Sequence, residues 1–363
     1  MVCIVAIGDQ HFTTKNIPEI DVFINVVTEM VTKQKPDFIV LLGDLLHTHE
    51  KIHTVPLNKA YEFINNMRQI AKTFILVGNH DYINASQFLT TNHWLNSLKE
   101  WDNVIVVDKI VYEVLENKLF VFAPYVEPNR FIEALDTITA PLDWKKASII
   151  FGHQEFAGCN MNGNYISNQG HWDLSFPQVI AGHIHTRQHL QRNVYYTGSS
   201  METEWKEGID TYNSIACLTY DEKNNLQIEE MPLKLGRKLK LHMDFQELKH
   251  FDVATAKETT DTDDVIKLQI SGIPYEEFNT FKKTTKYKEL VDSNIRIDFE
   301  FDKKEVKINN QEIQAIIDDT SLTDFRSIFE SMANKECDPV FHQIYQFIMY
   351  DRVIEETDIL IVK

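Results

Sequence analysis

The stretch Gly78-Asn79-His80-Asp81 follows directly after the apolar run Thr73-Phe74-Ile75-Leu76-Val77. An apolar run rich in aromatic and β-branched residues that stops at a glycine is typical of a buried strand. In open α/β sheets, ligands bind at the carboxyl ends of the strands. Asn79 offers a neutral oxygen, His80 a nitrogen and a transferable proton, and Asp81 a carboxylate that can brace an imidazole. The sequence therefore predicts a functional site at this strand end, provided that other strands bring matching groups to it.

The residues before this stretch repeat the same arrangement of a strand followed by polar groups. Buried strands are predicted at Val2–Ile7 and Asp37–Leu42, and amphipathic helices at Pro18–Lys35 and Pro56–Ile70. Together with Thr73–Val77 they give the order β-α-β-α-β. Such crossovers imply a parallel sheet with right-handed connections, so the predicted fold class is α/β.

The middle of the chain is expected to add further strands. A helix is predicted within Ser86–Trp101 and another at Arg130–Ile138. The runs Val104–Val107, Val111–Leu115 and Leu119–Ala123 are interpreted as a hairpin or an antiparallel edge. The sheet system is then completed by strands at Ala147–Phe151, Val179–Ala181, Val194–Thr197 and Ser214–Tyr220.

The composition changes near Gly236. Strands at Val265–Ile270 and Asn294–Phe301, around a helix at Tyr275–Tyr287, predict a small α+β unit. Three helices are predicted to follow, and the last two are rich in aromatic residues that need a surface to cover, on their own domain or on a partner. The three helices are predicted at Asn309–Asp319, Leu322–Asn334 and Pro339–Ile354. We therefore expect three parts, which are 1–235, 236–305 and 306–363.

Bulk composition limits the classes of function. The chain has 363 residues and a formal net charge of −18, which works against DNA binding by phosphate neutralisation. Bound divalent metals can invert the local field, or a partner can hold the DNA. No apolar run approaches the roughly 20 residues of a membrane helix. Four cysteines without CxxC spacing, and no signal peptide after Met1, indicate a soluble protein of the cytoplasm, the nucleus or a virus-infected cell.

Five predicted strand ends carry the same chemistry. Residues two apart in an extended segment point the same way, so Asp9 with His11 and His183 with His185 form two pairs. Histidine clusters often indicate zinc, but the carboxylates and the amide oxygen favour a harder ion such as Mn²⁺. The number of candidate ligands suits two divalent ions, with Asp44 as the carboxylate that bridges them. The candidate metal ligands are Asp9, His11, Asp44, Asn79, His153, His183 and His185.

These motifs, in this order, resemble the calcineurin-like metallophosphoesterase superfamily. The matching segments are Asp9-Gln10-His11, Gly43-Asp44, Gly78-Asn79-His80-Asp81, Gly152-His153 and Gly182-His183-Ile184-His185. Within the superfamily, the run Gly43-Asp44-Leu45-Leu46-His47 and the turn Gly198-Ser199 are most similar to SbcD-type nuclease subunits of DNA double-strand-break repair, including phage and viral relatives. The serine/threonine phosphatase branch is disfavoured, because no Val-Asp-Arg-Gly run follows Gly43-Asp44. The resemblance covers residues 1–220.

The resemblance implies a sandwich of two mixed sheets flanked by helices, with a small α+β cap that binds DNA and a helical C-terminal tail. It implies one ion held by Asp9, His11, Asp44 and His185. It implies a second ion held by Asp44, Asn79, His153 and His183. The catalytic residues that it implies are His80, which stabilises the transition state or protonates the leaving 3′-oxygen, and His47, which helps to set the DNA end.

The resulting hypothesis is a dinuclear-metal DNA nuclease in which a metal-bridging hydroxide attacks phosphorus. The resemblance adds 3′-to-5′ exonuclease and endonuclease action, and a homodimer within a complex with an SbcC-type, SMC-like ATPase. That ATPase would take the helical tail and supply DNA-binding surface. Two alternatives stay open, which are a phosphodiesterase or phosphatase for small molecules or phosphoproteins, and a non-catalytic scaffold that only binds a partner.

Several other residues allow two interpretations. Trp172 and Tyr165, in the polar loop from Gln154 to Asp173, either stack on a base or pin the loop. His49 and His53, near the loop of the site, either contact phosphate or lie at the surface, and the surface is the expectation for both. Asp81 is expected to brace the site rather than to bind metal. A lysine cluster in the small α+β unit either contacts the DNA backbone or is a solvated face, and its members are Lys282, Lys283, Lys286 and Lys288.

Overall fold

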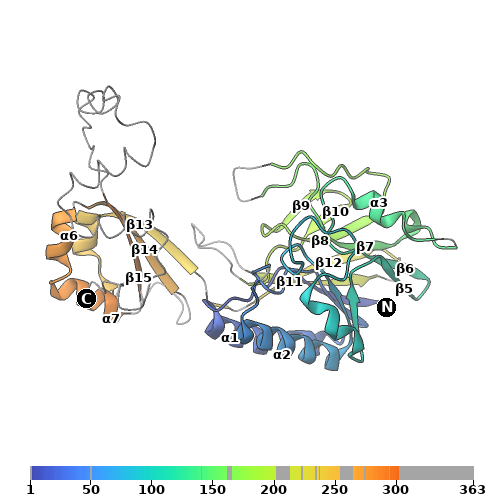
Figure 1. Ribbon diagram of the computed structural model, residues 1–363, viewed down its shortest axis with the longest axis horizontal. Coiled ribbons are helices and arrows are strands. Elements are labelled where there is room, and N and C mark those ends of the chain that lie inside the picture. Colours follow the sequence, from blue (N-terminus) through green and yellow to red (C-terminus); the bar gives the residue numbers. More distant parts are fainter. Residues whose placement is uncertain are drawn as a thin grey trace, which may run out of the picture. The chain divides into compact units, whose positions relative to one another are not determined.

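Figure 1 shows the computed structural model of the chain. The described residues are 2–49, 51–139, 141–161, 166–201, 213–221, 224–233, 235–236, 238–253, 265–273, 275–293 and 295–301. Tyr165 and the helical tail predicted over 306–363 lie outside these residues. Among the described helices, none is both long and apolar enough to cross a membrane.

A first sheet of six strands is built around the β-α-β-α-β segment. Its order is β12-β11-β1-β2-β3-β4, in which β1 to β4 are parallel and β11 is antiparallel to both of its neighbours. The predicted parallel sheet is thus confirmed. The strands are β1 (Cys3–Ile7), β2 (Phe38–Leu41), β3 (Lys72–Leu76), β4 (Val104–Val107), β11 (Ser214–Tyr220) and β12 (Leu226–Pro232).

Two helices, α1 (Ile17–Gln34) and α2 (Thr54–Ile70), lie along one side of this sheet (Figure 1). Pro18 occupies the first turn of α1, where its missing N–H costs no hydrogen bond, and Lys35 ends the helix in the left-handed conformation. The buried side chains of α1 recur every three or four residues, so they form one apolar face against the sheet. They are Ile20, Phe23, Ile24, Val27 and Val31.

A second sheet of six strands has the order β5-β6-β7-β8-β10-β9. Its four central strands are parallel, and each edge adds an antiparallel pair. Its strands are β5 (Val111–Leu115), β6 (Lys118–Phe122), β7 (Ile149–His153), β8 (Gln178–Gly182), β9 (Gln188–Gln191) and β10 (Val194–Tyr196). The short helices that precede or flank it are η1 (Trp94–Glu100), α3 (Phe131–Leu135) and η2 (Trp144–Lys146).

The two sheets pack face to face through an apolar layer. Side chains alternate along each strand, so Val5 of β1 faces the helices while Ile4 faces the second sheet. Phe74 of β3 and Phe122 of β6 stack with their ring centroids 3.9 Å apart and link the two sheets. The architecture is therefore the expected α/β sandwich of two mixed sheets flanked by helices.

A third, three-stranded sheet belongs to the small unit near the end of the described chain. Its order is β13-β14-β15, with β13 and β14 parallel, and it has an apolar core of its own. A capping box between Asp244 and Glu247 begins the first helix of this unit. The elements are β13 (Lys238–Asp244), α4 (Phe245–His250), β14 (Val265–Ile273), α6 (Tyr275–Phe281), α7 (Thr285–Asp292) and β15 (Arg296–Phe301). The boundaries 1–235 and 236–305 stay predictions.

Three predictions about local structure were wrong. The helix expected over Tyr275–Tyr287 is split into α6 and α7, because the side chain of Thr284 accepts a hydrogen bond from the Tyr287 N–H and starts a new helix. Val104–Val107 is not part of a hairpin. It forms β4, parallel to β3, because its side chains are apolar on both faces and enter two different cores.

The third concerns Ser86–Trp101, of which only the last part, η1, is helical. In the segment before η1, polar side chains bond to each other and to nearby backbone groups instead. Asn84 Oδ1 accepts from the backbone N–H of Ser86 at 3.1 Å and from Gln87 Nε2 at 2.9 Å. Such local bonds compete with the hydrogen bonds of a helix.

Candidate metal centre

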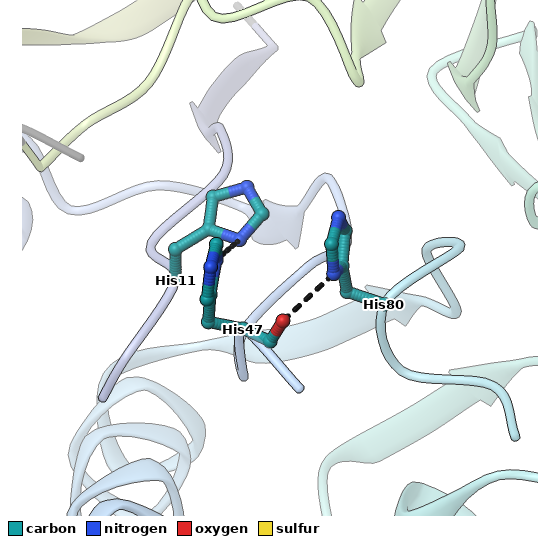
Figure 2. A group of neighbouring side chains, drawn as sticks. All are labelled: His11, His47 and His80. Atoms are coloured by element: carbon teal, nitrogen blue, oxygen red, sulfur yellow. Dashed lines mark hydrogen bonds between the residues drawn. The ribbon is translucent and has the colours of Figure 1, made fainter. Parts of the chain in front are cut away.

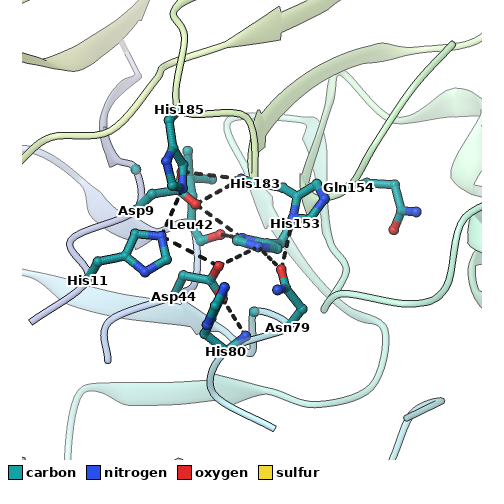
Figure 3. Close-up of polar contacts among 12 residues, drawn as sticks. Asp9, His11, Leu42, Asp44, Asn79, His80, His153, Gln154, His183 and His185 are labelled. Atoms are coloured by element: carbon teal, nitrogen blue, oxygen red, sulfur yellow. Dashed lines mark hydrogen bonds and ion pairs between the residues drawn. The ribbon is translucent and has the colours of Figure 1, made fainter. Parts of the chain in front are cut away.

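The seven predicted ligands come together where the two sheets present the carboxyl ends of their central strands (Figure 3). In the first sheet, Asp9 and His11 follow β1, Asp44 follows β2 and Asn79 follows β3. In the second sheet, the ligands come from the ends of β7 and β8, at His153, His183 and His185. Neighbouring parallel strands end at the same edge, which explains why residues so far apart in sequence meet.

Two histidine nitrogens converge on the side-chain oxygen of Asn79. His183 Nδ1 lies 2.8 Å and His153 Nε2 lies 3.0 Å from Asn79 Oδ1. The other ring nitrogen of His153 donates to the carbonyl oxygen of Leu42 at 2.7 Å. That bond holds the proton on Nδ1 and leaves the Nε2 lone pair directed at the centre, as the ring of a metal-binding histidine requires.

A second set of donors lies around His11. His11 Nε2 is 2.9 Å from His185 Nε2, and Asp9 offers a carboxylate oxygen to the same group. Asp9 is held by the backbone N–H of His183, which donates to Oδ1 at 2.9 Å and to Oδ2 at 3.2 Å. One carboxylate therefore ties the end of β1 to the end of β8.

Asp44 lies between the two sets of donors. Its Oδ2 is 3.3 Å from His153 Nε2 and 3.7 Å from His11 Nε2. Its other oxygen accepts the backbone N–H of His80 at 2.8 Å. This is the position that a carboxylate shared by two ions would occupy.

The backbone at these ligands is strained. Positive φ angles occur at four predicted ligands, which are Asp9 (32°), His11 (47°), Asp44 (53°) and His183 (81°). Each such conformation costs of order 1–3 kcal/mol in a residue other than glycine, and it persists only where the surroundings impose it. Gly43, with φ of 104°, lies so close to the site that an added Cβ would be 2.6 Å from His153 Nδ1. The folded structure therefore orients these side chains toward the site at a cost in local backbone stability.

The charges in the centre are buried and unevenly compensated. Burial raises the pKa of the Asp9 carboxyl to about 7 and lowers the pKa of His183 to about 3. Burial alone would also raise the pKa of Asp44, but the surrounding histidines hold it well below its usual range. Burial alone would lower the pKa of His153, but Asp44 and Asp9 raise it to about 9. In the described chain, the ion-pair partners of both carboxylates are histidines, so added cations would stabilise the carboxylate charge.

The donor set fits two divalent cations. Ligands at about 2.1 Å in an octahedron are about 3.0 Å from one another, close to the separations around Asn79 and between His11 and His185. Carboxylate, amide and imidazole donors together suit a borderline ion rather than a soft one. Among the described residues, three clusters could each hold an ion. Two of them contain a carboxylate, and these are Asp9, His11 and His185, and Asp44, His153 and His183. The third consists of His11, His47 and His80.

The predicted catalytic histidines, His47 and His80, stand beside the two clusters that contain a carboxylate. His80 Nδ1 is 2.8 Å from the carbonyl oxygen of His47, and His47 Nδ1 is 3.3 Å from His11 Nδ1 (Figure 2). Both side chains reach solvent, unlike the buried ligands Asp9 and Asp44. Their roles in catalysis stay predictions.

Asp81 lies behind the centre, where it was expected as a brace. Among the described residues, however, its hydrogen-bond partners are backbone groups and an indole rather than an imidazole. Its Oδ2 accepts the backbone N–H groups of Asp44 at 2.8 Å and of Gly78 at 3.1 Å, and its Oδ1 accepts Trp94 Nε1 at 2.9 Å. Asp81 therefore fixes the loops that carry Asp44 and Asn79.

Sequence reasoning missed the contacts that two residues make at the site. Tyr125, after β6, places its ring 5.5 Å from that of His183, and no motif around it indicates this position. His49 was expected at the surface, but it is half-buried and stacks on His80. Trp172 pins the loop, because it is buried and its Nε1 donates to the carbonyl oxygen of Pro177 at 3.1 Å.

Comparison with known proteins points to the same chemistry. A protein of Invertebrate iridescent virus 6 named "Putative phosphoesterase 244L" is 42% identical over 281 residues, which is 77% of this chain and 97% of that protein. "Putative phosphoesterase 078R" of Invertebrate iridescent virus 3 is 37% identical over 298 residues, which is 82% of this chain and 84% of that protein. A solved structure described as "GAP50 the anchor in the inner membrane complex of Plasmodium" covers 76% of this chain and 98% of its own, at 14% identity and a TM-score of 0.35. That structural likeness is too low to carry an argument.

The similarity to the iridovirus protein 078R reaches past the metal centre. An alignment of 298 residues leaves out only 65 of the 363, so it must include residues 66–298 and hence β13 and β14. Residues 4–187, which contain all seven predicted ligands, match the family model described as calcineurin-like phosphoesterase. This chain therefore belongs to the calcineurin-like phosphoesterase family.

Proposed function

We propose that the chain is a dinuclear-metal DNA nuclease that hydrolyses phosphodiester bonds in DNA recombination and double-strand-break repair. The observation that carries the proposal is the place of His80. Its backbone N–H is bonded to Asp44. Its ring forms a third cluster with His11 and His47, but it lies outside the two clusters that contain a carboxylate, and it reaches solvent. A half-buried imidazole beside a metal pair is well placed to serve a leaving group.

Within this proposal, the chain's own residues orient the substrate and protonate the leaving oxygen. Divalent ions bound by the two clusters would polarise the phosphate and activate water. A carbonyl oxygen only accepts hydrogen bonds, so the bond to His47 O fixes a proton on His80 Nδ1 and leaves Nε2 for exchange with the leaving oxygen. Burial lowers the pKa of His80, although Asp44 opposes this. A phosphodiester anion beside the ring favours its protonated form, so substrate binding would charge the donor.

Support for DNA as the substrate comes from outside the metal centre. The resemblance to SbcD-type subunits at Gly43-Asp44-Leu45-Leu46-His47 is one reason. The small unit adds a second reason, because its Lys282 and Lys283 are exposed after α6, where they can contact the DNA backbone. Both lysines lie within the range of the iridovirus alignment. An SbcC-type ATPase partner, with the nuclease as a homodimer, would offset the net charge of −18 by supplying its own DNA-binding surface. Mn²⁺ is the proposed ion, since the donors combine nitrogen and oxygen.

The test uses the wild-type chain and His80→Ala, each with Mn²⁺, on end-labelled duplex and single-stranded DNA. We expect the wild type to shorten DNA from its 3′ ends, and His80→Ala to keep its metal while losing about 10²- to 10⁴-fold in rate. His53→Ala, an exposed histidine at the start of α2, is the matched control. Turnover of a cyclic nucleotide without DNA cleavage would instead establish a small-molecule phosphodiesterase. Metal binding without turnover of either substrate would leave the scaffold alternative.

A further inference from the structure

We propose that His49 is a positioning residue that holds the ring of His80 in its working orientation. The inference rests on the proposed function in that it takes His80 as the proton donor. The rings of His49 and His80 stack with centroids 4.7 Å apart and planes at 17°. His49 Nδ1 in turn lies 3.3 Å from the carbonyl oxygen of Tyr82, which fixes the edge of the His49 ring.

The ring of His80 is constrained by other imidazoles as well. His47 stacks on it with centroids 5.3 Å apart and planes at 10°, and His11 meets it edge-on at 5.0 Å (Figure 2). Any rotation of the His80 ring would break both stacks and the bond from Nδ1 to His47 O. His47 and His49 both come from the loop between β2 and α2, so one loop supplies two of the three contacts.

We expect His49 to influence the orientation of the His80 ring, and the size of that effect can be given. An aromatic pair contact corresponds to about a 2- to 12-fold change in an equilibrium between an ordered and a rotated ring. His49 contacts His80, and its effect should therefore appear in kcat rather than in KM. A rotated ring cannot pass its proton to the leaving oxygen, so substrates that need this proton should suffer most.

Two synthetic phosphodiesters distinguish a change in the orientation of the His80 ring from a general loss of structure in the variant. Nitrophenolate leaves bis(p-nitrophenyl) phosphate without a proton, whereas the phenolate of diphenyl phosphate is a more basic leaving group that gains from one. With Mn²⁺, we expect His49→Ala to lower kcat for diphenyl phosphate about 3- to 10-fold, with KM within twofold and little change for the nitrophenyl diester. His49→Phe keeps a flat ring in the stack but loses the bond to Tyr82 O, so it should restore most of the lost kcat, which an effect of lost folding would not do. His53→Ala should match the wild type on both substrates.

A second measurement follows the ring itself, independently of turnover. When the histidines of the chain are labelled with ¹⁵N, the nuclear magnetic resonance signal of His80 in the wild type should report a proton on Nδ1. His49→Ala should shift or broaden that signal, and His49→Phe should return it. An unchanged His80 signal in His49→Ala, or His49→Phe as impaired as His49→Ala, overturns the proposal.

The outcomes also separate this inference from the proposed function. Wild-type enzyme that hydrolyses both diesters but no DNA refutes the nuclease proposal, while the comparison of His49 variants still decides the role of His49. If no diester is hydrolysed, the His80 signal alone decides it.

Discussion

Replacing Gly43 by alanine adds one methyl group at the point where the backbone passes closest to the candidate metal centre. The new Cβ would lie 2.6 Å from His153 Nδ1 and 3.0 Å from the Cα of Gly78. The neighbour at Gly78 is backbone, so it cannot move aside as a flexible side chain would. Gly158 provides a matched control, because its φ of 95° is close to the 104° of Gly43, while its added Cβ would meet only Leu190 Cδ1, at 3.2 Å.

Both substitutions place alanine in left-handed backbone, but only Gly43→Ala also overpacks against neighbouring backbone. Left-handed backbone in alanine costs about 1–2 kcal/mol at either position. Overpacking adds about 1–3 kcal/mol at Gly43 alone, since the end of a leucine side chain can yield. We expect Gly43→Ala to lower the free energy of unfolding by about 2–5 kcal/mol and Gly158→Ala by about 1–2 kcal/mol. The methyl group would also push the His153 ring off its bond to Leu42 O, so Mn²⁺ affinity should fall about 10- to 100-fold in Gly43→Ala only.

Urea unfolding in the presence of EDTA measures the first effect without any contribution from bound metal. Titration of the folded proteins with Mn²⁺ by calorimetry measures the second. Equal unfolding free energies for the two variants would refute the clash at His153. Equal Mn²⁺ affinities with unequal stabilities would show that His153 does not hold the ion.

Three further predictions follow from the structure. Adding EDTA should lower the unfolding temperature, because ions that bind only the folded chain stabilise it by about 2.7 kcal/mol at 100 times Kd; His153→Ala should abolish the Mn²⁺-induced rise seen by thermal shift, and the exposed His171→Ala should keep it. Phe74→Ala should cost about 3–5 kcal/mol in urea unfolding, since Phe74 is buried and stacks on Phe122, and a loss below 1 kcal/mol would mean that the two sheets do not depend on this contact. Burial alone would raise the pKa of Asp108, but His93 and Lys99 hold it below its usual value, so Asp108 stabilises the fold fully above the unfolded pKa of about 4 and loses this effect as pH falls toward its folded pKa. The stability difference between wild type and Asp108→Asn should therefore be constant near neutral pH and shrink on acidification, whereas the exposed Asp102→Asn should show no such trend.

Much of the fold could be predicted from the sequence because its strongest patterns are local. The helix over Pro18–Lys35 has apolar residues at helical spacing and a proline in its first turn, and it forms within a residue of the expected bounds. The strands that end in Gly8, Gly43 and Gly78 read as continuous apolar runs, as buried parallel strands do. Prediction failed where side chains decided the backbone, as in the polar segment before η1 and at Thr284.

The assignment of β4 and β5 to different sheets could not be predicted. Val104–Val107 and Val111–Leu115 are separated by three residues, yet they belong to different sheets. Short spacing suggested a hairpin, because adjacent strands usually pair. Only the packing of the two sheets, with apolar side chains of β4 entering both cores, determines which pairing forms.

By itself, the sequence determined which residues are the candidate ligands of the metal centre, since strand ends with Asp, Asn and His stand out whatever their arrangement in space. The tertiary structure alone decided how these groups meet. It places Asp44 between two sets of donors, turns Asp81 toward backbone N–H groups and stacks His49 on His80. The physical reason is that chemistry depends on the type of side chain, which the sequence states directly. Contacts across two sheets depend on packing between segments far apart in the chain, such as His11 and His185, which are 174 residues apart, and no local pattern records that.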